Sequence, residues 1–284
     1  MKPPTDLNLL ARQWGASAVP FSLANPEDWL ETPAMHAATD ALTQTATLRS
    51  VMLLTGPNGV GKSALAGRWL RALDSRLFAP LCLTHATLSG CGILASLATK
   101  LGKPVSFRRE RNLQFIEDAF AQLEHRIPVV LVDEAQNLSA SSLEEIRLLL
   151  GLNLPQHPSF ALILLGDEFL LSTLQLRSQR ALYSRLGCHR NLAPWTPEQC
   201  AQYLTTALTA VGLSAASLEP AASELLVNAS GGIPRSLSLL ARSAWILAAT
   251  GQAQRITPDH VNGALQSVPC VPGLARPPQE VLPA

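Results

Sequence analysis

The sequence is short of lysine, of tyrosine and of any excess charge. Only four of its 284 residues are lysine and two are tyrosine. Arginine therefore supplies most of the positive charge, and the formal net charge is only +1. A chain so nearly balanced has no overall field that would draw it to nucleic acid or to an anionic membrane surface. Any binding of a polyanion must therefore depend on local clusters of cations.

Cysteine and long apolar runs are also scarce. The five cysteines are scattered, without a CxxC pair or a Cys/His cluster, which argues against both a disulfide framework and a zinc site. We interpret them as buried thiols of a reducing compartment. There is no run of 18 apolar residues, and the first fifteen residues lack a signal-peptide core. We expect a cytoplasmic protein with no membrane partner.

Hydrophobic residues make up 47% of the chain, which is enough to build a folded core. Apolar runs predict strands at 51–55, 80–86, 128–132 and 160–165. Helical patterns lie between them, at 33–46, 93–101, 112–125 and 141–150. The last of these opens with a potential capping box from Ser141 to Glu144. The alternation predicts an α/β fold, with a parallel sheet covered by helices.

From residue 194 onward the patterns are helical only, and Thr-Pro pairs at 196–197 and 257–258 mark helix starts. We therefore predict a lead-in over 1–46, a nucleotide-binding α/β domain over 47–193 and a small all-helical lid domain over 194–268. Residues 269–284 contain five prolines and are expected to form a disordered tail.

A glycine-rich turn follows the first predicted strand and precedes a helix. It matches the pattern GxxxxGK[ST] in full, with Gly56, Pro57, Asn58, Gly59, Val60, Gly61, Lys62 and Ser63. Such a loop turns its backbone N–H groups toward phosphate oxygens at the positive end of a helix. Lys62 would reach the β- and γ-phosphates, and Ser63 would offer its hydroxyl to Mg²⁺. A chance glycine turn is the alternative. The flanking strand and helix favour a site for ATP and Mg²⁺.

Two acids end the predicted strand at 128–132. Asp133 would hold Mg²⁺, directly or through water, and Glu134 would orient and activate the attacking water. The alternative is that both acids simply cap the next helix. The phosphate loop about seventy residues upstream favours catalysis. An additional strand between the two motif strands, together with a second acid, is typical of P-loop proteins that hydrolyse ATP.

Arg235 stands in the first turn of a predicted helix, after Gly231, Gly232, Ile233 and Pro234. A helix N-terminus is an unfavourable place for a cation. We therefore expect Arg235 to meet the phosphates of a bound nucleotide. The alternative is an ordinary surface arginine.

These motifs together resemble AAA+ ATPases, in particular the ExeA/GspA-like group and the related transposition regulators of the TnsC and TniB kind. The resemblance covers residues 14 to 268. It is carried by Pro20-Phe21, GPNGVGKS at 56–63, LVDEAQNL at 131–138, LILLGDEFL at 162–170, Ala181-Leu182 through Arg185-Leu186, GGIPRSLSLLARSA at 231–244 and the segment 256–265.

The resemblance implies further site residues. Asp167, after the strand at 160–165, stands where these folds place a γ-phosphate sensor, although the ExeA-like proteins usually have glutamine there. Asp167 would orient water; the alternative is a surface turn acid. Arg177, Arg180 or Arg185 would act as an arginine finger on a neighbouring subunit's ATP, with Arg185 preferred. Ordinary surface arginines are the alternative for all three.

Between residues 68 and 111 cations greatly outnumber acids. The part of this stretch that the resemblance assigns to contact with the DNA backbone contains Lys100, Lys103, Arg108, Arg109 and Arg111. Such contacts would be sensitive to salt and independent of sequence. The alternative is a solvated charged face. Phe107 is the only aromatic residue between 88 and 111, so base stacking is not expected.

The preferred interpretation is an ATP-hydrolysing protein that forms a ring or filament on double-stranded DNA and regulates target selection for a partner transposase. Secretion members of the group continue into a membrane span, and its expected absence here favours a stand-alone, DNA-linked ATPase. A secretion-type assembly ATPase and a nucleotide switch with little turnover are the alternatives.

Overall fold

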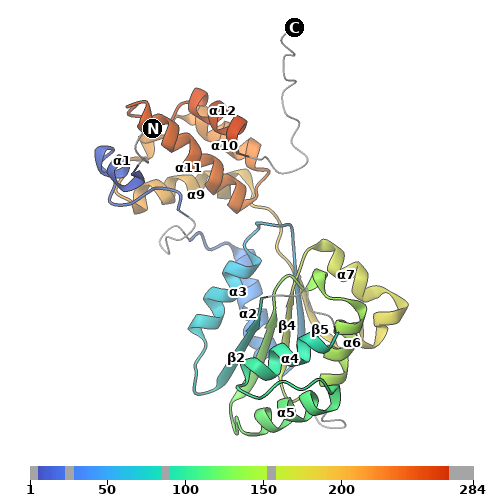
Figure 1. Ribbon diagram of the computed structural model, residues 1–284. Helices are drawn as coiled ribbons and strands as arrows, with labels where there is room; N and C mark the ends of the chain where they lie inside the picture. The colour runs from blue at the N-terminus through green and yellow to red at the C-terminus, as the bar shows by residue number, and fades with distance from the viewer. Residues whose placement is uncertain (1–5, 23–28, 85–89, 152–157, 269–284) are drawn as a thin grey trace, which may run out of the picture. The chain divides into compact units, whose positions relative to one another are not determined.

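The computed structural model divides into two compact units (Figure 1). One unit is Pro33–Ala193, and the other combines the residues before Pro33 with those from Pro194 onward. The structure describes residues 6–22, 29–84, 90–151 and 158–268. The lead-in expected over 1–46 is thus divided between the two units. The tail expected over 269–284 lies outside the described residues.

The described part of the first unit contains a five-stranded parallel sheet with strand order β2-β3-β4-β1-β5. Its strands are β1 (Val51–Thr55), β2 (Phe78–Leu83), β3 (Ile127–Val132), β4 (Ala161–Leu165) and β5 (Leu186–Asn191). β2 begins two residues before the predicted strand and lies at the sheet edge, beside β3 alone. It separates the two motif strands only in the sequence. In the sheet, β4 separates them.

Helices cover both faces of this sheet. α2 (Pro33–Thr47) packs on β1, β4 and β5, and contacts α3 (Lys62–Ala72). On the opposite face, Leu53, Val130 and Leu162 share one buried cluster with Leu94 of α4 (Gly90–Lys100) and Ile146 of α6 (Ala140–Leu149). α7 (Glu168–Gln175) contacts β1, and α5 (Arg109–Ala121) packs outside α4 (Figure 1). Alternate strand residues thus supply two apolar faces, as a buried parallel sheet requires.

The predicted capping box of α6 is wrong. Ser139, which has an extended backbone, is the N-cap, and its hydroxyl accepts the backbone N–H of Ser142. Glu144 lies within the helix and pairs with Arg147 instead. The helix therefore begins one residue earlier than predicted, because Ser139 rather than Ser141 satisfies its free N–H groups.

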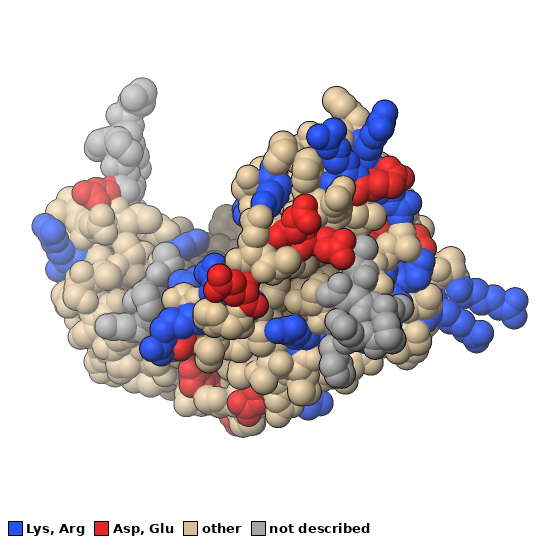
Figure 2. Space-filling view, turned by 90° about the horizontal axis from the view of Figure 1, so that it is seen from below, with Lys and Arg blue, Asp and Glu red and all other residues tan. Residues whose placement is uncertain are grey.

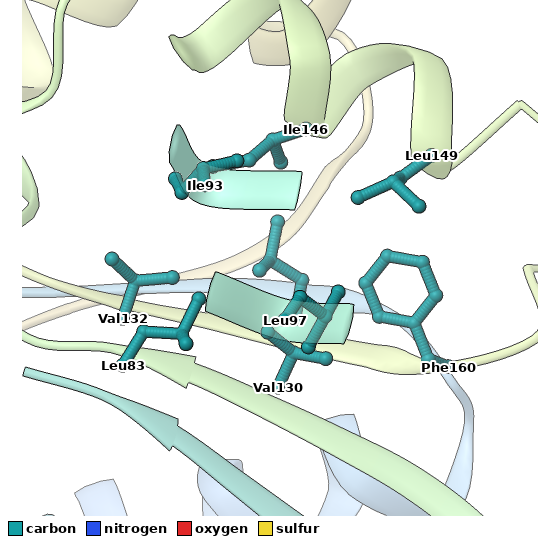
Figure 3. A pocket seen from close by; sticks show the side chains of 9 residues that line it. Leu83, Ile93, Leu97, Val130, Val132, Ile146, Leu149 and Phe160 are labelled. Atoms are coloured by element: carbon teal, nitrogen blue, oxygen red, sulfur yellow. The ribbon is translucent and has the colours of Figure 1, made fainter. Parts of the chain in front are cut away.

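A small gap lies between α4, α6 and the sheet (Figure 3). Only apolar side chains line it, among them Leu97, Val132, Leu149 and Phe160. The sticks in Figure 3 are all carbon, so the gap offers no polar group that would orient a ligand. We regard it as part of the hydrophobic core.

The second unit is helical in its described part. It contains α1 (Leu7–Gln13), α9 (Pro197–Ala210), α10 (Pro220–Ser230), α11 (Pro234–Thr250) and α12 (Pro258–Ser267). Thr196 and Thr257 cap α9 and α12, as predicted, and each takes part in a capping box. None of the described helices has the length and apolar character needed to cross a membrane.

Residues from the start of the chain complete the core of the helical unit. The Trp14 ring meets the Trp245 ring edge-on, with centroids 6.3 Å apart. Phe21 is fully buried, and its carbonyl oxygen accepts a hydrogen bond of 2.9 Å from the Ser238 hydroxyl. The Tyr203 hydroxyl donates to Ser238 in turn, at 3.0 Å. These contacts explain why the first thirty-two residues group with the C-terminal helices.

Candidate nucleotide-binding site

The phosphate loop connects β1 to α3 through backbone conformations that favour glycine. Gly56 has φ +150°, and a Cβ there would lie 2.4 Å from the carbonyl oxygen of Leu192. Gly61 has φ +107° and is the N-cap of α3. Both positions exclude a side chain, one for lack of space and the other by its left-handed backbone. The loop is therefore shaped so that backbone N–H groups at the start of α3 are available to an anion.

Lys62 begins α3 and is almost completely buried, with 7% of its surface exposed. Its Nζ donates hydrogen bonds to the carbonyl oxygens of Gly56, at 2.7 Å, and of Pro57, at 3.1 Å. A buried ammonium group requires such partners because burial removes its hydration. The loop thus holds a cation where the glycine pattern predicts the phosphates of a nucleotide.

The acids at the end of β3 meet the end of the loop. The Ser63 hydroxyl donates to Asp133 Oδ1 at 3.0 Å, across seventy positions of sequence. The same oxygen accepts the backbone N–H of Glu134 at 2.9 Å. The hydroxyl and carboxylate oxygens are hard ligands of the type that Mg²⁺ prefers, so the donor set fits that ion. The structure brings together the residues predicted to bind the metal and to activate water.

Glu134 has a left-handed backbone, with φ +53°, and its side chain is held by a residue that the sequence analysis missed. The amide of Gln136 donates from Nε2 to Glu134 Oε2 at 2.6 Å. Its carbonyl oxygen, Oε1, accepts the backbone N–H of Asp167 at 3.3 Å. The only signal for this contact in the sequence is an amide two residues after the acids.

Asp167 caps α7. Its Oδ1 accepts the backbone N–H groups of Phe169, at 3.0 Å, and Leu170, at 3.2 Å. The residue predicted as a phosphate sensor therefore stands at the end of β4, between the two motif strands, and its carboxylate is engaged by the helix that follows. The sequence analysis considered Asp167 as a sensor of the γ-phosphate or as a surface turn acid. It did not predict that Asp167 would be the N-cap of α7.

A polar cluster supports the end of β1. The Thr55 hydroxyl donates to Asn191 Oδ1 at 3.1 Å and lies 2.9 Å from Nε2 of His189. A hydroxyl has one hydrogen to donate, so His189 must be the donor in the second contact. Burial lowers the pKa of His189, which favours the neutral ring. Sequence analysis missed this cluster, which ties the residue before the phosphate loop to β5.

Comparison with known proteins agrees with this geometry. A family model described as an AAA domain matches residues 45–174, from the end of α2 to α7. Residues 45–174 are thus similar to AAA domains, and the unit Pro33–Ala193 that contains them is called the AAA domain below. The match includes the phosphate loop, both acids and Asp167. It confirms the resemblance to AAA+ ATPases that the motifs predicted.

Two relatives resemble the chain over longer stretches. General secretion pathway protein A of Aeromonas hydrophila is 27% identical over 225 residues, which are 76% of this chain and 40% of that protein. ATP-dependent target DNA activator B of Escherichia phage Mu is 26% identical over 164 residues, 58% of this chain and 50% of that protein. The chain thus spans half or less of these relatives. Both confirm the group to which the sequence motifs pointed.

Solved structures share the fold of the AAA domain and its helical partner. Cdc6p from Pyrobaculum aerophilum matches with a TM-score of 0.67 and 17% identity, covering 87% of this chain and 70% of that one. The RuvB branch migration motor of Thermotoga maritima matches with a TM-score of 0.56 and 20% identity, covering 88% and 72%. The predicted fold class is confirmed.

The candidate arginine fingers of the AAA domain have different surroundings. Arg185 is half-buried, and its Nη1 donates to the carbonyl oxygen of Arg147 at 2.7 Å, near the end of α6. Arg177 and Arg180 are exposed, and within the described ranges their side chains make no hydrogen bond or ion pair. Arg185 is thus held by Nη1 against the end of α6 in its own chain.

Arg235 belongs to the helical unit and is exposed at the second position of α11. The glycines before it have a structural role of their own. Gly232 has φ +75°, and a Cβ there would lie 2.4 Å from the carbonyl oxygen of Trp195. The Gly-Gly pair therefore ends α10 and allows the start of α11 to lie against the 194–195 segment.

The predicted DNA-binding cations are not equally available. Arg109 Nε pairs with Glu145 Oε1 at 2.9 Å, and Glu145 is 5% exposed. Lys103 Nζ donates to Gln122 at 2.8 Å, and the Arg111 guanidinium lies over the Phe115 ring, 5.6 Å from its centroid. Lys100 and Arg108 are exposed to solvent. On the face shown in Figure 2, the basic side chains lie in small groups among acidic and uncharged residues, and they do not form one continuous basic patch.

Phe107, beside these cations, is fully exposed on a turn that is held in place. The buried side chain of Asn112 accepts the N–H of Ser106 and donates to its carbonyl oxygen, both at 2.8 Å. The Ser106 hydroxyl accepts the N–H of Arg108 at 3.1 Å. The backbone of the turn is therefore held in place, and the Phe107 ring stands exposed beside Arg108.

Proposed function

We propose that this protein binds and hydrolyses ATP with Mg²⁺, assembles on double-stranded DNA and regulates target selection for a partner transposase. The observation that carries the first part is the meeting of Lys62, Ser63, Asp133 and Glu134 at one end of the sheet. Lys62, Ser63 and Asp133 lie around the phosphate loop. The backbone N–H of Glu134 donates to the same Asp133 oxygen that accepts the Ser63 hydroxyl.

Each residue has a separate task in the proposed reaction. The loop N–H groups and Lys62 bind the β- and γ-phosphates, and Ser63 and Asp133 hold the metal. Mg²⁺ bound there would neutralise charge on the phosphate oxygens. Glu134 orients a water molecule and accepts its proton as that water attacks the γ-phosphorus, and the bond from the γ-phosphorus to the bridging oxygen breaks so that ADP leaves. Arg185 and Arg235 would stabilise phosphate charge, the former from a neighbouring subunit.

The DNA part of the proposal is supported by a relative and by the basic residues. The phage Mu relative is described as an ATP-dependent target DNA activator. Lys100, Arg108 and Arg111 offer cations without a carboxylate partner within the described ranges, whereas Arg109 is committed to Glu145. Each cation contributes little binding free energy by itself. An assembly held together by ATP would repeat these cations along one duplex, and their small contributions to the affinity would add up.

Similarity to the Aeromonas secretion protein supports a second candidate, an assembly ATPase that acts on proteins. Binding to DNA separates the two. We would measure fluorescence anisotropy of a labelled random duplex with a slowly hydrolysed ATP analogue and with ADP, across a salt series. The first proposal expects cooperative binding only with the ATP analogue, steeply weakened by salt.

The variant for this experiment is Arg108→Ser with Arg111→Ser. Each lost phosphate contact should reduce the slope of log affinity against log salt by about one per subunit. Arg255→Ser, which removes an exposed arginine from the helical unit, is the matched control and should bind as the wild type does. Equal binding with ADP, or no binding in either state at low salt, would refute assembly on DNA and favour the secretion-type function.

A further inference from the structure

Gln136 joins the residues that follow β3 and β4: its amide nitrogen donates to Glu134, and its amide oxygen accepts from the backbone of Asp167. We infer that Gln136 is a positioning residue for hydrolysis, which fixes the carboxylate of Glu134 and couples it to the backbone at Asp167. The inference rests on the proposed function, because it assumes that Glu134 accepts the proton of the attacking water.

The orientation of the amide follows from its partners. The carboxylate of Glu134 needs a donor, and the backbone N–H of Asp167 needs an acceptor. Only one orientation of Gln136 meets both needs, because the flipped amide would place oxygen against oxygen and N–H against N–H. The contact from Gln136 Nε2 to Glu134 Oε2 measures 2.6 Å.

The place that Gln136 occupies is narrow. A Cβ at Gly166 would lie 3.1 Å from Gln136 Oε1 and 2.5 Å from Leu170 Cδ2. Gln136 also lies on a short 3₁₀ turn, Ala135–Asn137, and Ala135 is fully buried. The glycine at 166 therefore leaves room for the amide, and the buried alanine holds the turn that presents it.

The hydrogen bond from Gln136 holds the side chain of Glu134, a residue whose backbone is in the left-handed region. A non-glycine residue with φ +53° holds a conformation that costs free energy and persists only when its surroundings enforce it. Gln136 holds one carboxylate oxygen, Oε2, with a neutral donor, and this leaves Oε1 to meet water. Because α7 begins directly after Asp167, a displacement of α7 would pass through Gln136 to the reacting carboxylate.

Three variants separate positioning from packing. Gln136→Leu keeps the approximate volume and removes both hydrogen bonds. Gln136→Asn keeps the amide but is too short to reach both partners. Gln136→Glu keeps the shape and places a second carboxylate against Glu134. The matched control is Asn137→Leu, on the same turn, whose exposed side chain makes no hydrogen bond in the described part of the chain.

The measurements are ATP turnover, KM, the pH profile of kcat and affinity for a fluorescent ATP analogue. We expect Gln136→Leu and Gln136→Asn to lower kcat about tenfold to hundredfold, the value of a hydrogen bond to a charged group, with analogue affinity unchanged. Gln136→Glu should shift the acidic limb of the profile to higher pH, because two adjacent carboxylates compete for one proton. Asn137→Leu should turn over as the wild type does.

Glu134→Gln distinguishes the two levels of the proposal. If it hydrolyses ATP normally, the assigned role of Glu134 is wrong and the proposed function fails at that point. If it is impaired while all Gln136 variants keep wild-type kcat and pH profile, only the inference about Gln136 is overturned. The double variant Glu134→Gln, Gln136→Leu should be no slower than Glu134→Gln alone. A further multiplicative loss would show that Gln136 acts other than through Glu134.

Discussion

The ion pair of Arg109 and Glu145 joins the start of α5 to α6, and its loss should destabilise the AAA domain. The Glu145 side chain is 7% exposed and that of Arg109 is 37% exposed. Exposed pairs contribute about 0–1 kcal/mol, whereas breaking a buried pair costs about 3–5 kcal/mol. One partner here is buried and the other half-exposed, so we expect Arg109→Met to lower the free energy of unfolding by about 2 kcal/mol at pH 7.

The loss should depend on pH in a defined direction. Burial raises the pKa of Glu145, and Arg109 opposes that shift. Without Arg109 the pKa rises further, so the folded state of the variant holds its proton to a higher pH than the unfolded state does. A raised carboxyl pKa means that stability is greatest at low pH and falls as pH rises through the shifted value. The deficit of Arg109→Met should therefore be largest at pH 7 and shrink as the pH falls toward about pH 4, where Glu145 is protonated in both the folded and the unfolded state.

Urea unfolding followed by circular dichroism, at several pH values, measures this loss. Glu145→Gln removes the buried charge, so the double variant should be nearly as stable as Glu145→Gln alone. Arg76→Met, which breaks an exposed pair with Asp74, is the control and should have no measurable effect. A pH-independent deficit, or a deficit equal to that of Arg76→Met, would refute the reasoning. Weaker DNA binding by folded Arg109→Met would return that residue to the predicted DNA-binding set.

Gly56→Ala should abolish binding of a fluorescent ATP analogue, because the new methyl group would collide with the backbone at Leu192. The helical unit should keep its melting transition. Normal affinity for the analogue would show that the loop has room for a methyl group. Arg185→Ala should lower ATP turnover but not affinity for the analogue. If Arg185 acts across subunits, mixing this variant with Glu134→Gln should restore part of the activity. An intact assembly without such restoration would argue against action across subunits. Phe107→Ala should weaken duplex binding in the anisotropy assay if the exposed ring enters the DNA, whereas unchanged affinity would show that the ring does not contact the duplex.

Local motifs predicted which residues form the candidate nucleotide site, because strand, turn and helix follow one another within a few residues of Lys62. Asp133 was predictable for the same reason, as a carboxylate at the end of a buried strand. Gln136 was not, because its contact with Asp167 spans 31 positions and depends on β4 lying beside β3. A pattern of charges likewise cannot show that Arg109 faces a buried acid from another helix.

The boundaries of the two units illustrate the same limit. Short apolar patterns predicted β1 to β4, and the helices α2, α4, α5 and α6, to within four residues at each end, because local sequence determines their periodicity, but they did not predict β5. Nothing local connects Phe21 to Ser238, which lie 217 positions apart. The assignment of residues 1–46 as a lead-in followed from their mixed pattern, and only the three-dimensional contacts group the residues before Pro33 with the C-terminal helices.

Because the helical unit is assembled from both sides of the AAA domain, its folding is tied to the progress of translation. Phe21 leaves the ribosome long before Ser238, by roughly 10–45 s at ordinary rates of synthesis. During that interval the complete AAA domain can form its own core, while Trp14 and Phe21 still lack the helices that bury them. Trp14 and Phe21 are made well before the helices that bury them, so they are expected to be among the last residues to reach their final packing, and during synthesis they belong to an apolar segment that a chaperone can recognise.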